Sequence, residues 1–232
     1  WWNTVKVADF DNDGDTDIIT GNWGLNTRIK PSINEPITLY RNDFDDNKKV
    51  DPVITHYHDG KETVLVSKDI LASQLPFLNK KYLYYKDFAE ANFDDLFSKV
   101  KIKEAEKKQV FELASCYFEN KGDGSFKTHK LPFFAQISSV NAIEVQDFNK
   151  DGFLDVFLVG NNYHINTQLG KLDALHGIIL MNDKNGFFKE ELNHKFNVEG
   201  DARNIDKIKI KGDHYFLISR NNDSPVFLKI ND

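Results

Sequence analysis

The chain is almost free of sulfur. Its 232 residues include one cysteine, Cys116, and one methionine. A single thiol excludes a disulfide within the chain. Because Cys116 lies in an alternating, β-like run (110–118), we interpret it as a core residue rather than as a reactive thiol.

Several common sequence signatures are also missing. No apolar run reaches the roughly 18 residues of a membrane-spanning helix, and no signal peptide is visible. Since Trp1-Trp2 lead directly into an expected strand, we expect the chain to be a segment of a longer protein. The net charge of −6 and the lack of a basic patch argue against nucleic acid as a partner. No nucleophile motif, phosphate-binding loop or HExxH pair is present.

Aromatic and acidic residues are abundant instead. Apolar residues make up 40 % of the chain and include 19 Phe, with 8 Tyr beside them, which is ample for a core. The length fits one large domain or two small ones.

The most informative stretch is 9–17, DFDNDGDTD. It places aspartates on alternate positions: Asp9, Asp11, Asp13, Asp15 and Asp17. Carboxylates this close repel one another, and the usual reason to tolerate this is a hard cation that prefers oxygen ligands. Gly14 allows a positive φ at the sharp turn, so side chains at positions 1, 3, 5 and 9 and the carbonyl at position 7 can surround Ca²⁺. The alternative is a solvated acidic turn.

This loop is not an EF-hand. Position 12 is Thr20, where an EF-hand has a bidentate Glu, and β-type runs flank the loop in place of helices. The sequence therefore predicts a calcium loop between two strands.

Two further copies follow. In 43–51 the expected ligands are Asp43, Asp45, Asn47 and Asp51, with the carbonyl of Lys49, and Lys48 replaces the glycine, so we expect weaker binding. In 147–155 they are Asp147, Asn149, Asp151 and Asp155, with the carbonyl of Phe153. Copies one and three are each followed by an apolar strand and Gly-Asn, at 21–22 and 160–161.

The remaining pattern indicates four-stranded units. Gly-rich hairpins at 117–126 and 180–188 each place an aromatic residue after the turn, and with the calcium-loop hairpins they make units of propeller-blade size. A shift of 60 residues predicts a fourth, degenerate copy, in which Lys207, Lys209, Lys211 and Tyr215 replace the ligands. We expect a blade of the same shape there without calcium, the alternative being a chance alignment.

The region 64–109 differs in character and is predicted to be a helical insertion. Ser67 is a candidate N-cap, and Phe88, Phe93, Leu96 and Phe97 follow at mostly helical spacing. The predicted organisation is thus 1–63 with loops one and two, 64–109 as the insertion, and 110–232 with loop three and the degenerate copy.

These motifs resemble the FG-GAP/VCBS repeats of integrin-α-like β-propellers, most of all bacterial, Bacteroidetes-type VCBS-repeat proteins associated with ASPIC/UnbV domains. Besides the loops, the segments 51–62 and 220–223 and the LPFL stretch at 75–78 carry the resemblance. It implies an all-β propeller, partial or of about four blades, whose four-stranded antiparallel blades hold two or three structural Ca²⁺ ions. It also implies that all five aspartates of the first loop serve as metal ligands.

The resemblance implies an extracytoplasmic, non-catalytic module that binds a protein or a carbohydrate on its propeller face. The alternative is a catalytic propeller such as a calcium-dependent polysaccharide lyase or hydrolase. His56, His58 and His164 are the side chains left for catalysis, although surface or packing roles are typical of such residues. Trp1, Trp2 and Trp23 could line a sugar-binding face or pack between blades. Loops of this type fill where calcium is millimolar, which favours a secreted, periplasmic or cell-surface location.

Overall fold

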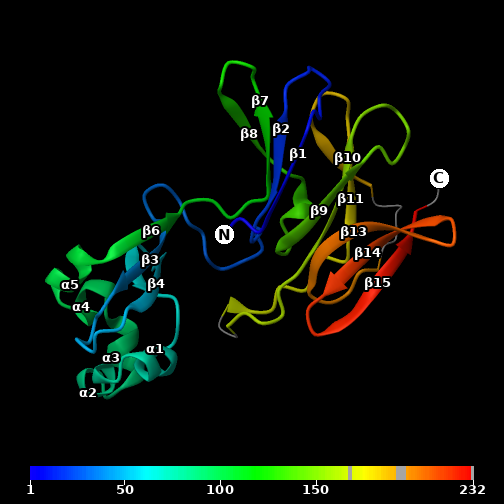
Figure 1. Ribbon diagram of the computed structural model, residues 1–232. Helices are drawn as coiled ribbons and strands as arrows, with labels where there is room; N and C mark the ends of the chain where they lie inside the picture. The colour runs from blue at the N-terminus through cyan, green and yellow to red at the C-terminus, as the bar shows by residue number, and fades with distance from the viewer. Residues whose placement is uncertain (167–168, 192–196, 231–232) are drawn as a thin grey trace. The chain divides into compact units, whose positions relative to one another are not determined.

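The computed structural model describes residues 1–166, 169–191 and 197–230, which form two compact units (Figure 1). The main unit consists of residues 1–27 and 113–232, and the inserted unit consists of residues 28–112. The described part of the chain is mostly β, with four antiparallel sheets. This confirms the expected antiparallel β-sheets and a helical region within a mostly β chain.

The main unit contains three of these sheets, which we call the first, second and third sheet. The first sheet has the order β1-β2-β7-β8: Thr4–Ala8, Asp17–Gly21, Cys116–Asn120 and Phe126–Lys130. The second has the order β9-β10-β11-β12: Val140–Gln146, Asp155–Gly160, Ile178–Asn182 and Phe188–Glu191. The third has the order β13-β14-β15: Ala202–Ile210, Asp213–Arg220 and Asp223–Lys229. A short 3₁₀ helix, Phe133–Ala135, precedes the second sheet.

The three sheets pack face to face through two apolar clusters. Ile19 and Tyr117 of the first sheet pack with Ile143 and Leu180 of the second. On the other face of the second sheet, its buried apolar side chains pack with those of the third, among them Phe157, Ile179, Phe216 and Ile218. This is the alternation expected of strands buried on both sides. The second sheet is therefore a middle layer.

A buried asparagine ties the three sheets together. Asn141 at the start of β9 accepts a hydrogen bond from the Asn3 side chain at 3.2 Å. Its Nδ2 donates to the carbonyl of Asn161 at 2.6 Å and to that of Ala202 at 2.9 Å. Because a buried amide left without partners is costly, this network fixes how the three sheets meet.

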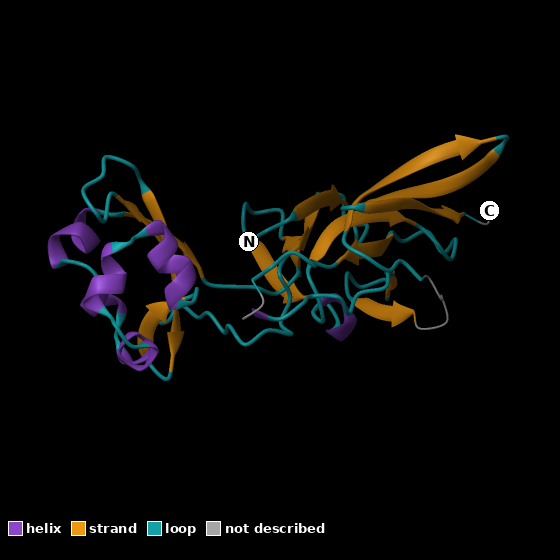
Figure 2. Ribbon diagram, turned by 90° about the horizontal axis from the view of Figure 1, so that it is seen from below, coloured by secondary structure: helices purple, strands orange, loops and turns teal. Residues whose placement is uncertain are grey.

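The inserted unit has its own sheet, with the order β5-β4-β3-β6. Its strands are β3 Ile37–Asn42, β4 Asp51–His58, β5 Lys61–Val64 and β6 Glu106–Val110. The helices are α1 Lys68–Gln74, α2 Phe77–Lys81, α3 Tyr85–Glu90, α4 Phe93–Leu96 and α5 Lys99–Glu104. Figure 2 shows these helices gathered beside the sheet, and one apolar cluster joins them to it through Tyr40, Phe44 and Val53.

Three local predictions are confirmed. Ser67 caps α1, since its side chain accepts a hydrogen bond from the backbone N–H of Ile70. Both predicted hairpins form, as β7–β8 and β11–β12. Cys116 is fully buried, as expected of a core residue.

The division of the chain differs from the predicted one. The sequence placed the second acidic loop with the first in 1–63 and limited the insertion to 64–109. In the structure the second loop joins β3 to β4 inside the inserted unit, 28–112. The reason is that β6, beyond the helices, pairs with β3. The whole segment is thus inserted between β2 and β7 of the first sheet.

The degenerate copy also differs in detail. It forms a sheet of three strands rather than four in the described part of the chain. Lys211 and Gly212, with φ of 51° and 100°, make a tight turn between β13 and β14 where the other copies have acidic loops. Within the described residues of the main unit, the sheets do not close into a ring.

The Asn141 network yields a test of the packing. Asn141→Ala should lower the free energy of unfolding by about 2 kcal/mol, because it leaves buried carbonyls without donors. Asn204→Ala, which removes an exposed amide bonded only to the neighbouring Asp206, should change it by less than about 0.5 kcal/mol. Denaturant unfolding of both variants makes the comparison. Equal losses would show that Asn141 does not fix the sheets.

Candidate metal sites

Three loops of the same length and conformation connect strand pairs. We call residues 9–17 loop 1, residues 43–51 loop 2 and residues 147–155 loop 3. Each has positive φ at its fourth and sixth positions: Asn12 and Gly14, Asp46 and Lys48, Lys150 and Gly152. Lys48 therefore adopts the left-handed conformation that glycine takes in the other loops, with φ of 69°.

The carboxylate at position 1 organises each turn. In loop 1, Asp9 accepts hydrogen bonds from the backbone N–H groups of Asp13 and Gly14 at 3.2 and 3.0 Å. The same two bonds recur with Asp43 in loop 2 and Asp147 in loop 3. Loops with different side chains thus share one backbone fold, which the position 1 carboxylate holds.

The carboxylate at position 9 is buried in every loop. Asp17 and Asp155 are 0 % exposed and Asp51 is 5 % exposed. Each accepts the backbone N–H of the phenylalanine at position 2, at 2.9 to 3.0 Å. Backbone N–H groups stabilise each of these buried carboxylates, and in loops 1 and 2 the carboxylate belongs to a group of three acidic residues that could hold a metal ion.

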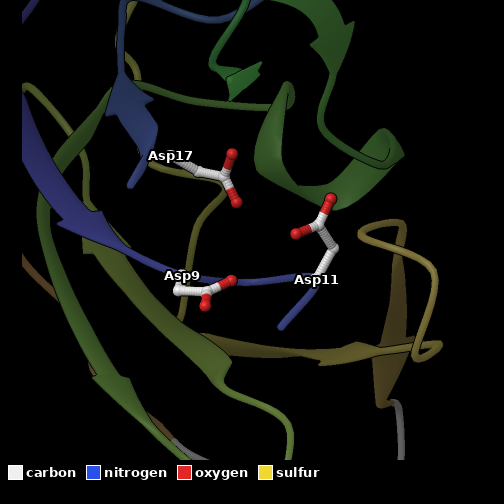
Figure 3. Close-up of side chains that lie close together, drawn as sticks. All are labelled: Asp9, Asp11 and Asp17. Carbon is white, nitrogen blue, oxygen red and sulfur yellow. The ribbon is translucent and has the colours of Figure 1, made fainter. Parts of the chain in front are cut away.

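Loop 1 concentrates the most negative charge. Oxygens of Asp9, Asp11 and Asp17 lie within 4.8 Å of one another, and Figure 3 shows the three carboxylates facing a common space. Burial, together with the charges of Asp17, Asp13 and Asp9, raises the pKa of Asp11. Among the described residues, no Lys, Arg or His forms an ion pair with this loop. Such a group is electrostatically unfavourable without a cation.

Loop 2 has the same arrangement of three carboxylates, but a lysine side chain from α5 lies beside it. Oxygens of Asp43, Asp45 and Asp51 lie within 4.8 Å of one another. Lys101 of α5 pairs with Asp46 and donates to the carbonyl of Asp43 at 2.6 Å. Although burial acts to raise it, the pKa of Asp43 is lowered by backbone hydrogen bonds from Lys48 and Asn47 and by the Lys101 charge. The positive charge of Lys101 is a second reason, besides Lys48 at the glycine position, to expect weaker calcium binding in loop 2.

Loop 3 has fewer carboxylates and its own lysine. Lys184, in the β11–β12 turn, lies 3.2 Å from Asp151. Burial, with the charges of Asp151 and Asp147, raises the pKa of Asp155. Position 3 is Asn149, whose side-chain oxygen accepts the backbone N–H of Asp151. We therefore expect the cation affinity of loop 3 to lie below that of loop 1.

The other sequence-predicted ligands form hydrogen bonds or contacts within or beside the turns. Side-chain oxygens of Asp13, Asn47 and Asp151 each accept the backbone N–H two residues on. Asp15 lies against the β7–β8 turn, where a Cβ at Gly122 would come within 2.6 Å of its carboxylate. Ligation by these residues, and by the carbonyls of Asp15, Lys49 and Phe153, stays a prediction.

Sequence reasoning missed the support that the hairpins give to the loops. The backbone N–H of Asn120 donates to Asp17 at 2.8 Å, and that of Asn182 to Asp155 at 2.8 Å. Tyr117 adds a hydroxyl bond to Asp17 at 2.9 Å. Both hairpins have an asparagine at the same position, and this repetition could have indicated a shared role. The role becomes clear only from the pairing of β2 with β7 and of β10 with β11, which brings each asparagine to an acidic loop.

The three candidate histidines belong to different units. His56 and His58 both lie on β4 of the inserted unit, whereas His164 lies in the main unit, 3.5 Å from Asp201. Burial lowers the pKa of His56. Trp1 and Trp23 have ring centroids 4.9 Å apart, so they pack on each other, while Trp2 packs edge-on against Phe118.

Comparison of the sequence with models of protein families and with curated proteins found no match in either. None of the described helices has the length and apolar character needed to cross a lipid bilayer.

The crowding in loop 1 gives a titration test. In the metal-free protein, Asp9→Asn should lower the pKa of Asp11, because it removes one of the charges that raise it. Carboxyl NMR titration measures this shift directly. Asp206→Asn, an exposed change on β13 outside the loops, is the control and should leave the pKa of Asp11 unchanged. An unchanged value in Asp9→Asn would show that the carboxylates are not coupled.

Proposed function

We propose that this chain is a calcium-stabilised, propeller-like β-sheet module that binds a protein or glycan outside the cytoplasm and is not itself an enzyme. The observation that carries the proposal is the loop 1 triad. Three carboxylates share one space, one of them fully buried, and none is paired with a basic side chain in the described part of the chain. Oxygen-only donors in a flexible loop fit Ca²⁺ better than a softer metal.

The blade-like sheets support the propeller part of the proposal. In the first and second sheets, an acidic loop joins the first two strands and a hairpin joins the last two. The sheets stack face to face with β9 beside both β1 and β13, as first strands do around a propeller axis. Calcium then acts as folding energy, because it compensates carboxylates that are otherwise repulsive.

The edge of the sheets opposite the loops is the expected ligand side. Antiparallel pairing places loops 1 and 3 and the turns of β7–β8 and β11–β12 at one edge. The other edge carries the stacked Trp1 and Trp23 and the connections to the inserted unit. Partly buried aromatic rings of this kind can offer an edge or face to a sugar ring or to a protein loop. Because this edge contains no acidic loop, a ligand there would not compete with calcium.

The first experiment is thermal unfolding with calcium and with excess EDTA, together with metal counting. A site filled at about 100 times its Kd adds about 2.7 kcal/mol, so two or three bound ions should raise Tm by about 10 °C or more. No bound calcium and no response to EDTA would overturn the proposal. The variant Asp9→Asn with Asp11→Asn should lose part of the response, whereas Asp206→Asn should keep all of it.

Lys184 provides a second test, specific to loop 3. Lys184→Met should increase calcium affinity at loop 3, since it removes an ammonium 3.2 Å from Asp151. Lys189→Met is the matched control, because Lys189 is on the same hairpin but faces Asp183, at 3.9 Å. Isothermal titration on a background with loop 1 disabled resolves the difference. Equal affinities in the two variants would exclude competition by Lys184.

A further inference from the structure

Among the described residues of the main unit, no layer covers the apolar side chains on one face of the first sheet. Val5 and Val7 of β1 are 59 % and 61 % exposed, and Trp2 is 50 % exposed. A hollow of about 680 Å³ lies on this face, and its lining includes Trp2, Val5, Ile18, Phe118 and Phe126. An open apolar area of this kind on a protein surface marks an interaction site.

The equivalent face of the second sheet is an interface. Placing Asp9 on Asp147 matches Val5 with Ile143 and Ile18 with Val156, and placing Asn120 on Asn182 matches Phe118 with Leu180. These partners in the second sheet are 0 to 1 % exposed, buried against the first sheet. The exposed positions of the first sheet therefore correspond to positions of the second sheet that are buried by a neighbouring sheet.

The third sheet also has an exposed face, on the side that points away from the second sheet. Phe216 and Ile218 of β14 point toward the second sheet. Alternation turns Leu217 and Tyr215 to the other side, where Leu217 pairs with Phe227, which is 50 % exposed. The 60-residue shift aligns Leu217 with Phe157. Phe157 belongs to the second sheet and is buried against the third sheet. This face is thus the next surface of the stack.

We infer that a second copy of this chain docks here, with the open face of its third sheet packed on the open face of the first sheet. In this contact, the third sheet of one copy packs on the first sheet of the next copy, in the same way as the first sheet packs on the second and the second on the third within one chain. It is heterologous, because two different surfaces meet, and a chain of such contacts can close into a ring. The inference rests on sheet packing and holds whether or not the loops bind calcium.

Light scattering after size exclusion, over a range of concentrations, tests the inference. The mass should be a multiple of 26.8 kDa, at least two chains, and should fall to 26.8 kDa on dilution. Val5→Lys and Phe227→Glu should each weaken self-association at least tenfold, because each replaces an exposed apolar side chain of the contact with a charge. On the third sheet, this apolar patch lies beside Asp206 and Lys229, which are opposite Leu217 and Tyr215. Val100→Lys is the matched control, since Val100 is 62 % exposed on α5 of the inserted unit, and it should leave the mass unchanged.

Mixing the variants identifies the two surfaces. Val5→Lys keeps an intact third sheet and Phe227→Glu keeps an intact first sheet, so an equimolar mixture should associate where each variant alone does not. A monomer at every concentration overturns the inference. Loss of association in Val5→Lys but not in Phe227→Glu overturns it too, because the first sheet would then pair with itself. Circular dichroism melting of each variant shows that it is folded.

Discussion

The buried carboxylate that ends each acidic loop is the constraint on which the local structure depends. Asp17 is reached by the backbone N–H groups of Phe10 and Asn120 and by the Tyr117 hydroxyl. One side chain thus joins the loop, the core and the third strand of the sheet. The group that orders the hairpin is also one of the three carboxylates of loop 1 that could hold a metal ion.

The three loops show how one backbone serves different electrostatic settings. Among the described residues, loop 1 forms no ion pair and interacts with Lys121 of the β7–β8 turn only through the longer-range charges of Asp11 and Asp13, whereas Lys101 pairs with loop 2 and Lys184 with loop 3. These lysines come from elements remote in sequence from the loops that they contact. A lysine that neutralises part of a loop lowers its need for a metal, so identical folds need not have identical affinity. The chain combines one strongly acidic loop with two partly compensated ones.

The stacking of the three sheets extends this repetition to the core of the main unit. The second sheet is covered on both faces, while the first and third each have one covered and one open face. Asn141 fixes the order of the layers, because its amide reaches backbone or side-chain partners in all three sheets. The inserted unit leaves the β2–β7 pairing intact, which is possible because an insertion between two strands need not enter their hydrogen-bond ladder.

The local features of the structure can be predicted from the order of the residues. Alternating Asp residues, the Gly-rich turns and the apolar periods predicted the acidic hairpins, the paired strands and the helical character near Ser67, because each depends on neighbours within about ten residues. The other features depend on contacts that form when the chain folds. The pairing of β6 with β3 moved loop 2 into the inserted unit, and Lys101, Lys184, Tyr117 and Asn182 reached the loops from afar. Such contacts join segments far apart in the chain, and no local pattern specifies them.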